Sequence, residues 1–316
     1  MDKTHFWLEM PDNQEVFIRE WKPASDDILA VVQISHGMVE HSDRYDAFAS
    51  FLADKGIAVY ANDHRGHGLT GKKQGTMGLF APQSGFETAA EDLHQITKYI
   101  KEQHTETPIF LLGHSMGSFL ARRYIQNHSS FLDGIILSGT GSHPGPVTIP
   151  AKWIALREAA RKGISEPSPL LNKLTFGSFN KHTGSKETGF EWLTRDKEQI
   201  RTYVDDPMTG FTPTASFFYD LFSGFDLIDR SEYIDNISKS LPFLFITGTK
   251  DPVGKETKGV FKVMDRYYKH GLTNIIARFY EEGRHEMLNE TNKEEVYEDI
   301  HQWIKHTLHK NSPNNE

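Results

Sequence analysis

The stretch whose residues most clearly suggest catalysis places a serine between two glycines at a sharp corner. Gly113, Ser115 and Gly117 form a G-x-S-x-G pattern that follows the apolar run PIFLL and precedes the amphipathic run MGSFLARRYIQN. A strand that turns this tightly into a helix crowds the backbone at the serine, and glycines at the flanking positions relieve the crowding. An incidental turn serine is the alternative, but the setting favours a nucleophile held out toward a substrate.

A serine hydroxyl is a weak nucleophile, so it needs a base and a group that orients the base. Asp251 follows the apolar run FLFITG and His285 follows the run IIARFY, each just past the end of a predicted strand. Because ligands gather at the carboxyl ends of strands in open parallel sheets, these loops should meet. Three other aspartates precede the strand instead of following it, namely Asp226, Asp229 and Asp235. The chain order predicts a triad of Ser115, Asp251 and His285, with capping of the next helix as the alternative role for Asp251.

Two backbone N–H groups are predicted to stabilise a developing oxyanion. One belongs to Met116, directly after the candidate nucleophile. The other belongs to Met38 in the loop HGMVEH, which follows the apolar run ILAVVQIS and in which Gly37 permits close backbone approach. The alternative is that Gly37 is an ordinary loop glycine after a strand.

The segment DHRGHG, residues 63–68, offers two histidines and could suggest a metal site. Its ligands would be His64, His67 and one aspartate, and no separate third loop is expected to converge on them. A structural turn beside the site is therefore predicted. No metal and no organic cofactor is expected, because a serine, a histidine and an aspartate suffice for acyl transfer.

The composition is typical of a folded globular protein and narrows the range of partners. The chain has 316 residues, of which 37% are hydrophobic and 25% charged, with a net charge of −8 and no cysteine. The acidic balance argues against nucleic acid as a partner, and the lack of cysteine excludes disulfides and thiolate chemistry. The N-terminus lacks the pattern of a signal peptide, and no apolar run approaches the roughly 20 residues of a membrane span. A cytoplasmic location is therefore predicted.

The hydrophobic pattern predicts strands that alternate with helices. The runs THFWLEM and EVFIREW predict an antiparallel hairpin at a sheet edge, and residues 84–103 predict a helix with a Ser84–Glu87 capping box. Another helix is predicted over about residues 254–270. The alternation predicts an α/β fold with a mostly parallel central sheet and helices on both faces. The alternation of strands and helices stops after residue 140 and resumes near residue 226. Residues 1–140 and 226–316 are therefore predicted to form the core, and residues 141–225 an inserted helical cap.

Five motifs occur in an order found in a known family. The runs HGMVEHSDRY, NDHRGHGLT, GHSMGS, GTKDPVG and GRHEMLNE resemble those of α/β-hydrolases of the monoacylglycerol lipase/lysophospholipase group, which is also labelled serine aminopeptidase-like. The resemblance covers nearly the whole chain. It implies the α/β-hydrolase fold, and it places the nucleophile at Ser115, the acid at Asp251, the base at His285 and the oxyanion donors at Met38 and Met116.

The resemblance also implies the reaction, namely hydrolysis of a carboxylic ester through an acyl-enzyme. The expected substrate is a lipid such as a monoacylglycerol or a lysophospholipid. A small non-lipid ester, a peptide or amide bond, and a non-catalytic ligand receptor are the alternatives. The oligomeric state is left open.

Two features of the predicted cap bear on the substrate. Several cap aromatics are expected either to line the substrate pocket or only to anchor the cap, and the candidates for the pocket are Phe179, Trp192 and Phe218. Residues 151–190 hold seven Lys or Arg against three Glu. This basic strip could meet an anionic headgroup or make transient contact with a membrane surface, or it could be solvated cap surface.

Overall fold

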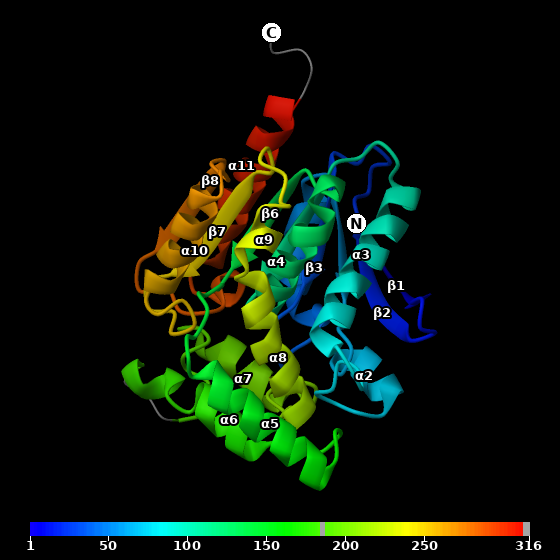
Figure 1. The fold of residues 1–316 in the computed structure, drawn as a ribbon. Helices are drawn as coiled ribbons and strands as arrows, with labels where there is room; N and C mark the ends of the chain where they lie inside the picture. The colour runs from blue at the N-terminus through cyan, green and yellow to red at the C-terminus, as the bar shows by residue number, and fades with distance from the viewer. Residues whose placement is uncertain (184–186, 312–316) are drawn as a thin grey trace.

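The computed structural model describes residues 1–183 and 187–311, and a single sheet of eight strands runs through it (Figure 1). The strands are β1 (Asp2–Glu9), β2 (Glu15–Lys22), β3 (Ala30–Ser35), β4 (Ile57–Asn62), β5 (Ile109–His114), β6 (Gly134–Ser138), β7 (Phe243–Gly248) and β8 (Ile275–Tyr280). Their order across the sheet is β1-β2-β4-β3-β5-β6-β7-β8. The predicted antiparallel hairpin at one edge is confirmed as β1 and β2, and β3 to β8 run parallel to one another.

Helices cover both faces of the sheet, which is why its central strands are apolar. Every residue of β3, β4, β5, β6 and β7 is buried. Alternate residues of a strand point to opposite faces, and β3 shows this directly: Val31 belongs to one core and Val32 to the other. The predicted mostly parallel sheet with helices on both faces is therefore confirmed.

The helices divide between two apolar cores, one on each side of the sheet. The helices of the described residues are η1 (Ser42–Tyr45), α1 (Asp46–Asp54), α2 (Gly68–Gln74), α3 (Gly85–Gln103), α4 (Met116–His128), η2 (Ser129–Phe131), α5 (Thr148–Lys162), α6 (Pro169–Phe176), η3 (Phe179–His182), α7 (Lys197–Asp205), α8 (Ala215–Ile228), α9 (Ser231–Ile234), α10 (Lys258–Lys269), η4 (Met287–Asn289) and α11 (Lys293–Asn311). The larger core includes side chains of α3, α4, α8 and α10. The other core is formed mainly with α1 and α11.

The parallel strands bring the predicted site loops to one edge of the sheet. The register pairs Ser35 of β3 with Gly113 of β5, and it pairs Gly248 of β7 with Tyr280 of β8. The loops after these strands hold residues 36–41, Ser115, Asp251 and His285. Strand order alone thus collects four chain segments that lie far apart in the sequence.

The chain between β6 and β7 forms the region predicted as a cap. Figure 1 shows α5, α6 and α7 as a group beyond the carboxyl ends of the strands. The predicted boundary at residue 225 falls inside α8, which packs on α5 and also on α3 and α4 of the core. The name "cap" is used below for residues 141–225, and the division of the chain into core and cap stays a prediction.

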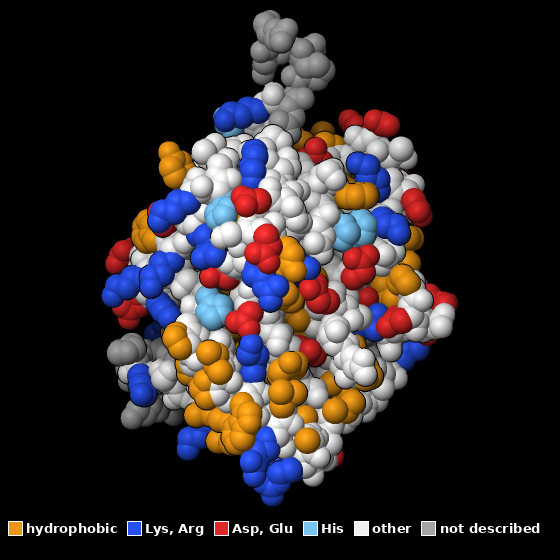
Figure 2. All heavy atoms as spheres, in the orientation of Figure 1, with side chains coloured by type: hydrophobic (Ala, Val, Ile, Leu, Met, Phe, Trp, Pro, Cys, Tyr) orange, Lys and Arg blue, Asp and Glu red, His pale blue; other side chains and the backbone are white. Residues whose placement is uncertain are grey.

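The outer surface of the cap carries exposed hydrophobic side chains. Figure 2 shows such side chains gathered over the lower end of the molecule, where Figure 1 places α5 and α6. Ile149 and Trp153 of α5 are 69% and 60% exposed, and Leu174 of α6 is 61% exposed. None of the helices in residues 1–183 and 187–311 has the length and hydropathy needed to cross a membrane.

Two local expectations about helix starts are wrong. Ser84 has left-handed backbone angles, with φ of 51°, and its side chain makes no capping hydrogen bond, so the predicted capping box is absent at this helix. The helix expected over about 254–270 begins at Lys258. Lys255, Glu256 and Thr257 before it all have positive φ, which no helix can continue through.

Candidate active site

Ser115 lies at the corner between β5 and α4 with strained backbone angles. Its φ is 51° and its ψ is −119°, which is uncommon for a residue with a side chain. The glycines on either side are required by space: a Cβ at Gly117 would lie 1.9 Å from the Ser35 carbonyl oxygen, and one at Gly113 would lie 2.5 Å from the Gly117 oxygen. The strain and the tight packing hold Ser115 at the end of the strand, where it lines two cavities.

Asp251 and His285 meet as a buried hydrogen-bonded pair. The Nδ1 atom of His285 lies 2.9 Å from Oδ1 of Asp251, and that oxygen also accepts the Val253 N–H at 2.9 Å. Both side chains are almost completely buried. Because Nδ1 is engaged by the carboxylate, Nε2 is the ring nitrogen left to serve a reacting group.

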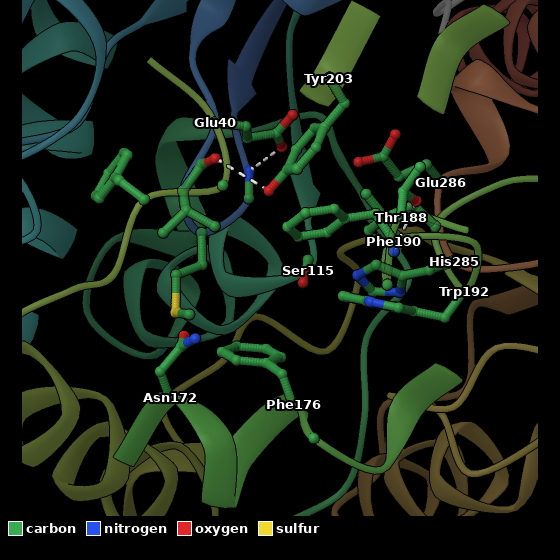
Figure 3. A pocket seen from close by; sticks show the side chains of 18 of the residues that line it. Glu40, Ser115, Asn172, Phe176, Thr188, Phe190, Trp192, Tyr203, His285 and Glu286 are labelled. Carbon is green, nitrogen blue, oxygen red and sulfur yellow. Dashed lines mark hydrogen bonds between the residues drawn. The ribbon is translucent and has the colours of Figure 1, made fainter. Parts of the chain in front are cut away.

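His285 and Ser115 line the same cavity, as Figure 3 shows. Among the described residues no hydrogen bond links the Ser115 hydroxyl to His285. Catalytic hydrogen bonds often tighten only when substrate binds. The three predicted residues therefore converge on one place, while their catalytic roles stay a prediction.

The surroundings of His285 favour its protonated form. Burial by itself lowers its pKa, but the Asp251 carboxylate, followed by Glu286 and Glu40, outweighs burial and raises the pKa above the ordinary 6.5. The neighbouring His114 ring lies 4.8 Å away, centre to centre, and burial together with His285 lowers its pKa to about 4. A base with a raised pKa beside a neutral histidine is suited to accept a proton near neutral pH.

The loop after β3 lies directly over Ser115. A Cβ at Gly37 would come within 3.3 Å of the Ser115 Cβ, and Met38 lines both cavities that contain Ser115. In the described part of the chain, the backbone N–H groups of Met38 and Met116 have no hydrogen-bond acceptor. The two predicted oxyanion donors are thus unpaired, and their residues line the apolar cavity together with the candidate nucleophile.

The DHRGHG segment supports this loop. His36 accepts the His64 N–H at its Nε2 atom (2.9 Å), so its Nδ1–H donates to the Gly37 carbonyl at 2.7 Å. Burial lowers the pKa of His36 to about 4, which keeps the ring neutral. The rings of His64 and His67 pack on His36 at 4.3 and 5.4 Å.

The other polar residues of DHRGHG are also engaged within the fold. Asp63 accepts the N–H and hydroxyl of Ser42, and Arg65 pairs with Asp92 and Asp12. In the described ranges, one group of three side chains could hold a metal ion, namely Glu91, His94 and His128 on α3 and α4. None of the three lines either cavity at Ser115.

Two cavities meet at Ser115, and one of them has the more polar lining. The polar cavity has a volume of about 250 Å³, and its polar lining includes Glu40, Asn172, Thr188, Tyr203 and Glu286. The apolar cavity has a volume of about 560 Å³, and its lining includes Phe119, Ile154, Leu171, Leu221 and Phe225. Both are also lined by Met38, Ser115 and Phe176.

The predicted substrate-binding aromatics separate into three places. Phe179 lines the apolar cavity, and Trp192 lines the polar cavity with its ring 5.0 Å from the His285 ring. Phe218 is fully buried against Phe217 and Phe222 and lines neither cavity. Phe218 therefore takes the alternative role foreseen for these residues, anchoring within the core.

Sequence reasoning missed four residues that surround the site. Glu40, Arg44, Glu286 and Tyr203 are buried together beside His285 and the loop after β3. The available signal was the spacing of Glu40 and Arg44, four residues apart in HGMVEHSDRY. Charged residues are ordinarily exposed, so composition gave no reason to place these inside.

Comparison with known proteins defines the class. The family model described as "Serine aminopeptidase, S33" (Hydrolase_4) matches residues 26–292, and the chain belongs to this family. The monoglyceride lipase of Mus musculus is 26% identical over 303 residues, which cover 94% of this chain and 89% of that protein. The monoacylglycerol lipase of Mycolicibacterium smegmatis is 26% identical over 289 residues, covering 90% of each chain.

A solved structure agrees over nearly the full length. The carboxyl esterase from Bacillus coagulans in complex with glycerol is 27% identical, has a TM-score of 0.89, and covers 98% of this chain and 99% of that one. These findings confirm the predicted α/β-hydrolase fold and the predicted membership of the monoacylglycerol lipase group. They also support the predicted enzyme class, a carboxylic ester hydrolase.

Proposed function

We propose that this protein hydrolyses carboxylic esters of lipids through an acyl-enzyme formed on Ser115. The observation that carries the proposal is the convergence at Ser115 of the Asp251–His285 pair with one polar and one apolar cavity. A nucleophile at such a junction suits a substrate with one polar and one apolar end.

The reaction begins with proton transfer from Ser115 Oγ to Nε2 of His285 as Oγ attacks the ester carbonyl carbon. Asp251 holds the imidazole in the required tautomer and stabilises the imidazolium. The carbon–oxygen bond to the alcohol then breaks, and His285 returns the proton to the departing oxygen. Water, activated by the same histidine, attacks the acyl-enzyme and releases the acid.

The negative oxygen of each tetrahedral intermediate is placed between the N–H groups of Met38 and Met116. Both groups lack an acceptor in the described residues, and both residues line the apolar cavity together with Ser115. Each such donor is typically worth about 3–4 kcal/mol in the transition state. Both donors are backbone groups, so this stabilisation depends on the fold of the loops and not on the methionine side chains.

We assign the acyl chain to the apolar cavity and the alcohol to the polar one. The apolar cavity, at about 560 Å³, is within the usual range for small-molecule sites and is lined by Phe179, Phe222 and Phe225. The polar cavity offers Asn172 and Thr188 as hydrogen-bonding groups near His285. The names of the relatives, a monoglyceride lipase and an esterase bound to glycerol, are consistent with a polyol ester.

The test is a screen of purified protein against acyl-chain length and headgroup. Monoacylglycerols, lysophospholipids, short p-nitrophenyl esters and amino-acid anilides are compared by kcat/KM. The proposal predicts turnover of esters with an acyl chain of several carbons and negligible turnover of anilides. Preference for anilides would make the protein a peptidase or amidase, and failure of the folded protein to react with a fluorophosphonate would make it a receptor.

We also propose that the outer face of the cap makes transient contact with a lipid surface. Ile149, Trp153 and Leu174 are exposed there, and Leu174 also lines the apolar cavity. The guanidinium of Arg157 lies over the Trp153 ring at 5.3 Å. Of the seven basic residues of the strip, Lys152 is paired with Asp226 and Lys162 with Glu158, and Lys186 lies outside the described residues.

Vesicle co-sedimentation tests this contact. The double variant Ile149→Ser, Trp153→Ser should bind phosphatidylcholine/phosphatidylglycerol vesicles less than the parent and should keep its turnover of a short soluble ester. Tyr268→Ser on α10, which removes an equally exposed aromatic residue, is the control. Equal vesicle binding by all three proteins would refute the contact.

A further inference from the structure

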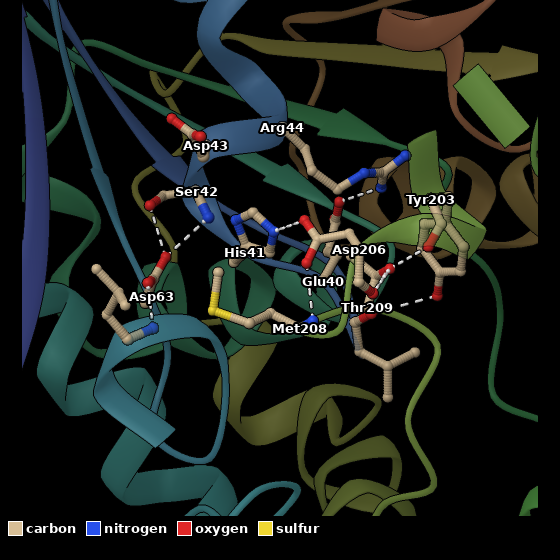
Figure 4. Close-up of polar contacts among 12 residues, drawn as sticks. Glu40, His41, Ser42, Asp43, Arg44, Asp63, Tyr203, Asp206, Met208 and Thr209 are labelled. Atoms are coloured by element: carbon tan, nitrogen blue, oxygen red, sulfur yellow. Dashed lines mark hydrogen bonds and ion pairs between the residues drawn. The ribbon is translucent and has the colours of Figure 1, made fainter. Parts of the chain in front are cut away.

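A single buried arginine joins the loop after β3 to the loop that holds the candidate base. Arg44 donates to Glu40 at 2.5 Å and forms a two-pronged pair with Glu286 at 2.7 and 2.6 Å. The three side chains are at most 8% exposed. Figure 4 shows Arg44, Glu40 and Tyr203 among these polar contacts.

Glu40 fixes the loop that carries one oxyanion donor. Its Oε1 atom accepts the Gly37 N–H at 2.5 Å and the Tyr45 hydroxyl at 2.8 Å. This hydrogen bond fixes the His36–Gly37 peptide, and the His36 Nδ1–H holds the carbonyl of the next peptide, Gly37–Met38, from which the Met38 N–H projects. Burial alone would raise the pKa of Glu40, but Arg44, His114 and His36 hold it at about 2, so the carboxylate stays ionised.

Glu286 connects Arg44 to the loop that holds His285. It follows His285 directly, and its backbone N–H donates to the Leu193 carbonyl of the cap at 2.7 Å. Burial alone would raise its pKa, but Arg44 lowers it below the ordinary value. One guanidinium therefore bridges two ionised carboxylates, one beside the oxyanion loop and one beside the base.

The cap completes the arrangement at Val39. This residue has φ of 53°, which is strained for a β-branched side chain. Its carbonyl accepts the Tyr203 hydroxyl at 3.2 Å and the Gly210 N–H at 2.9 Å, both from the cap. The Arg44 guanidinium lies 4.8 Å from the centre of the Tyr203 ring. A strained backbone persists only where its neighbours fix it, and here these neighbours belong to the cap.

A third contact from the same part of the cap reaches the same loop. Asp206 lies 2.7 Å from Nε2 of His41, and its Oδ1 accepts the Met208 N–H. Residues 203–210 of the cap thus contact positions 39, 41 and 44 of the loop region. These contacts are polar and directional, so they fix the position of the loop relative to the cap in addition to holding the two segments together.

We propose that Arg44 is a positioning residue that, with Glu40, Glu286 and Tyr203, couples the seating of the cap to the geometry of the oxyanion donor and the base. The inference rests on the proposed function and goes beyond it, because it assigns a role to residues that do not touch the reacting atoms. When residues 203–210 are seated, Val39 is held, Met38 presents its N–H, and Glu286 fixes the His285 loop.

The test is Arg44→Gln assayed on a short soluble p-nitrophenyl ester and by fluorophosphonate labelling. Loss of the bridge should misplace an oxyanion donor, so kcat and the labelling rate should both fall by about 100-fold while KM changes little. The matched control is Arg123→Gln on α4, an equally buried arginine that pairs with Glu87 and packs over Tyr233. This control should lose stability without losing kcat.

Tyr203→Phe keeps the inference testable if Arg44→Gln does not fold. It removes only the hydrogen bond to Val39, and kcat and the labelling rate should fall together by roughly fivefold. The inference is overturned if the folded Arg44→Gln protein keeps the parental kcat. If Arg44→Gln does not fold, a parental kcat in Tyr203→Phe overturns it instead. It is also overturned if Arg123→Gln loses as much kcat as Arg44→Gln. The proposed function fails separately, if the parent protein itself neither labels at Ser115 nor hydrolyses esters.

Discussion

The two cavities that meet at Ser115 differ in what surrounds them. The polar cavity is lined by Glu40, Tyr203 and Glu286, which are held in a network of charges and hydrogen bonds. The apolar cavity is lined largely by apolar side chains of α5, α6 and α8. Directional hydrogen bonds and ion pairs therefore constrain the side chains of the polar cavity, as suits a site where bonds are broken. We expect the apolar cavity, which is lined largely by apolar side chains, to accept acyl chains of more than one length.

The largest expected effect comes from the candidate nucleophile, which lines both cavities. Ser115→Ala should reduce kcat by a factor on the order of 10⁶ for every ester, whatever its chain or headgroup, because it removes the nucleophile. Steady-state rates across the substrate panel measure this, with circular dichroism as the control for folding. A variant that retained turnover of one ester class would show that the two cavities do not depend on one nucleophile.

Asp251→Asn acts through His285, which lines the polar cavity, and should have the next largest effect. The amide cannot hold His285 in the required tautomer, so kcat should fall on the order of 10⁴-fold. The apolar cavity is untouched, so the ranking of acyl chains should be unchanged. Near-normal turnover by this variant would mean that another residue orients the base.

A pair of aromatic substitutions separates the two cavities directly. Phe179→Ala enlarges the apolar cavity and should shift the preference between short and long acyl chains by about tenfold. Trp192→Ala opens the polar cavity and should instead change the preference among headgroups. Competition assays with mixed esters measure both ratios. If the two variants changed the same ratio, the assignment of one cavity to each end of the substrate would be wrong.

The smallest expected effect is the pH dependence set by the polar side. His285 must be neutral to accept a proton, and Asp251, Glu286 and Glu40 raise its pKa above 6.5. The value of kcat/KM should therefore rise with pH, reach half of its maximum above pH 6.5, and fall about tenfold per pH unit below that midpoint. A midpoint below 6.5 would show that the surrounding carboxylates do not act on the base.

The fold was largely predictable because its buried strands and helices have clear hydrophobic patterns in the sequence. Strands covered on both faces are continuous apolar runs, and the helices between them carry apolar stripes. The positions of Ser115, Asp251 and His285 could be predicted for the same reason, since each directly follows a strand that the sequence marks clearly. The absence of a capping box at α3 and the start of α10 could not be predicted, because Ser84, Lys255 and Glu256 take left-handed angles that no pattern of side chains requires.

The support of the site was not predictable from the sequence. Arg44 and Glu286 form their pair across 242 residues, and charged side chains in a single sequence are expected at the surface. Phe179 and Phe218 are the same residue type in the same predicted cap, yet one lines a cavity and the other lies in the core. Only the packing of α8 against the core separates these two roles.

The most direct test of the central claim is a crystal structure of the protein after reaction with a long-chain alkyl fluorophosphonate. We expect a bond from phosphorus to Ser115 Oγ, a phosphoryl oxygen between the N–H groups of Met38 and Met116, and the alkyl chain in the apolar cavity beside Phe179. A chain that occupied the polar cavity, or a phosphoryl group bound to a different residue, would contradict it.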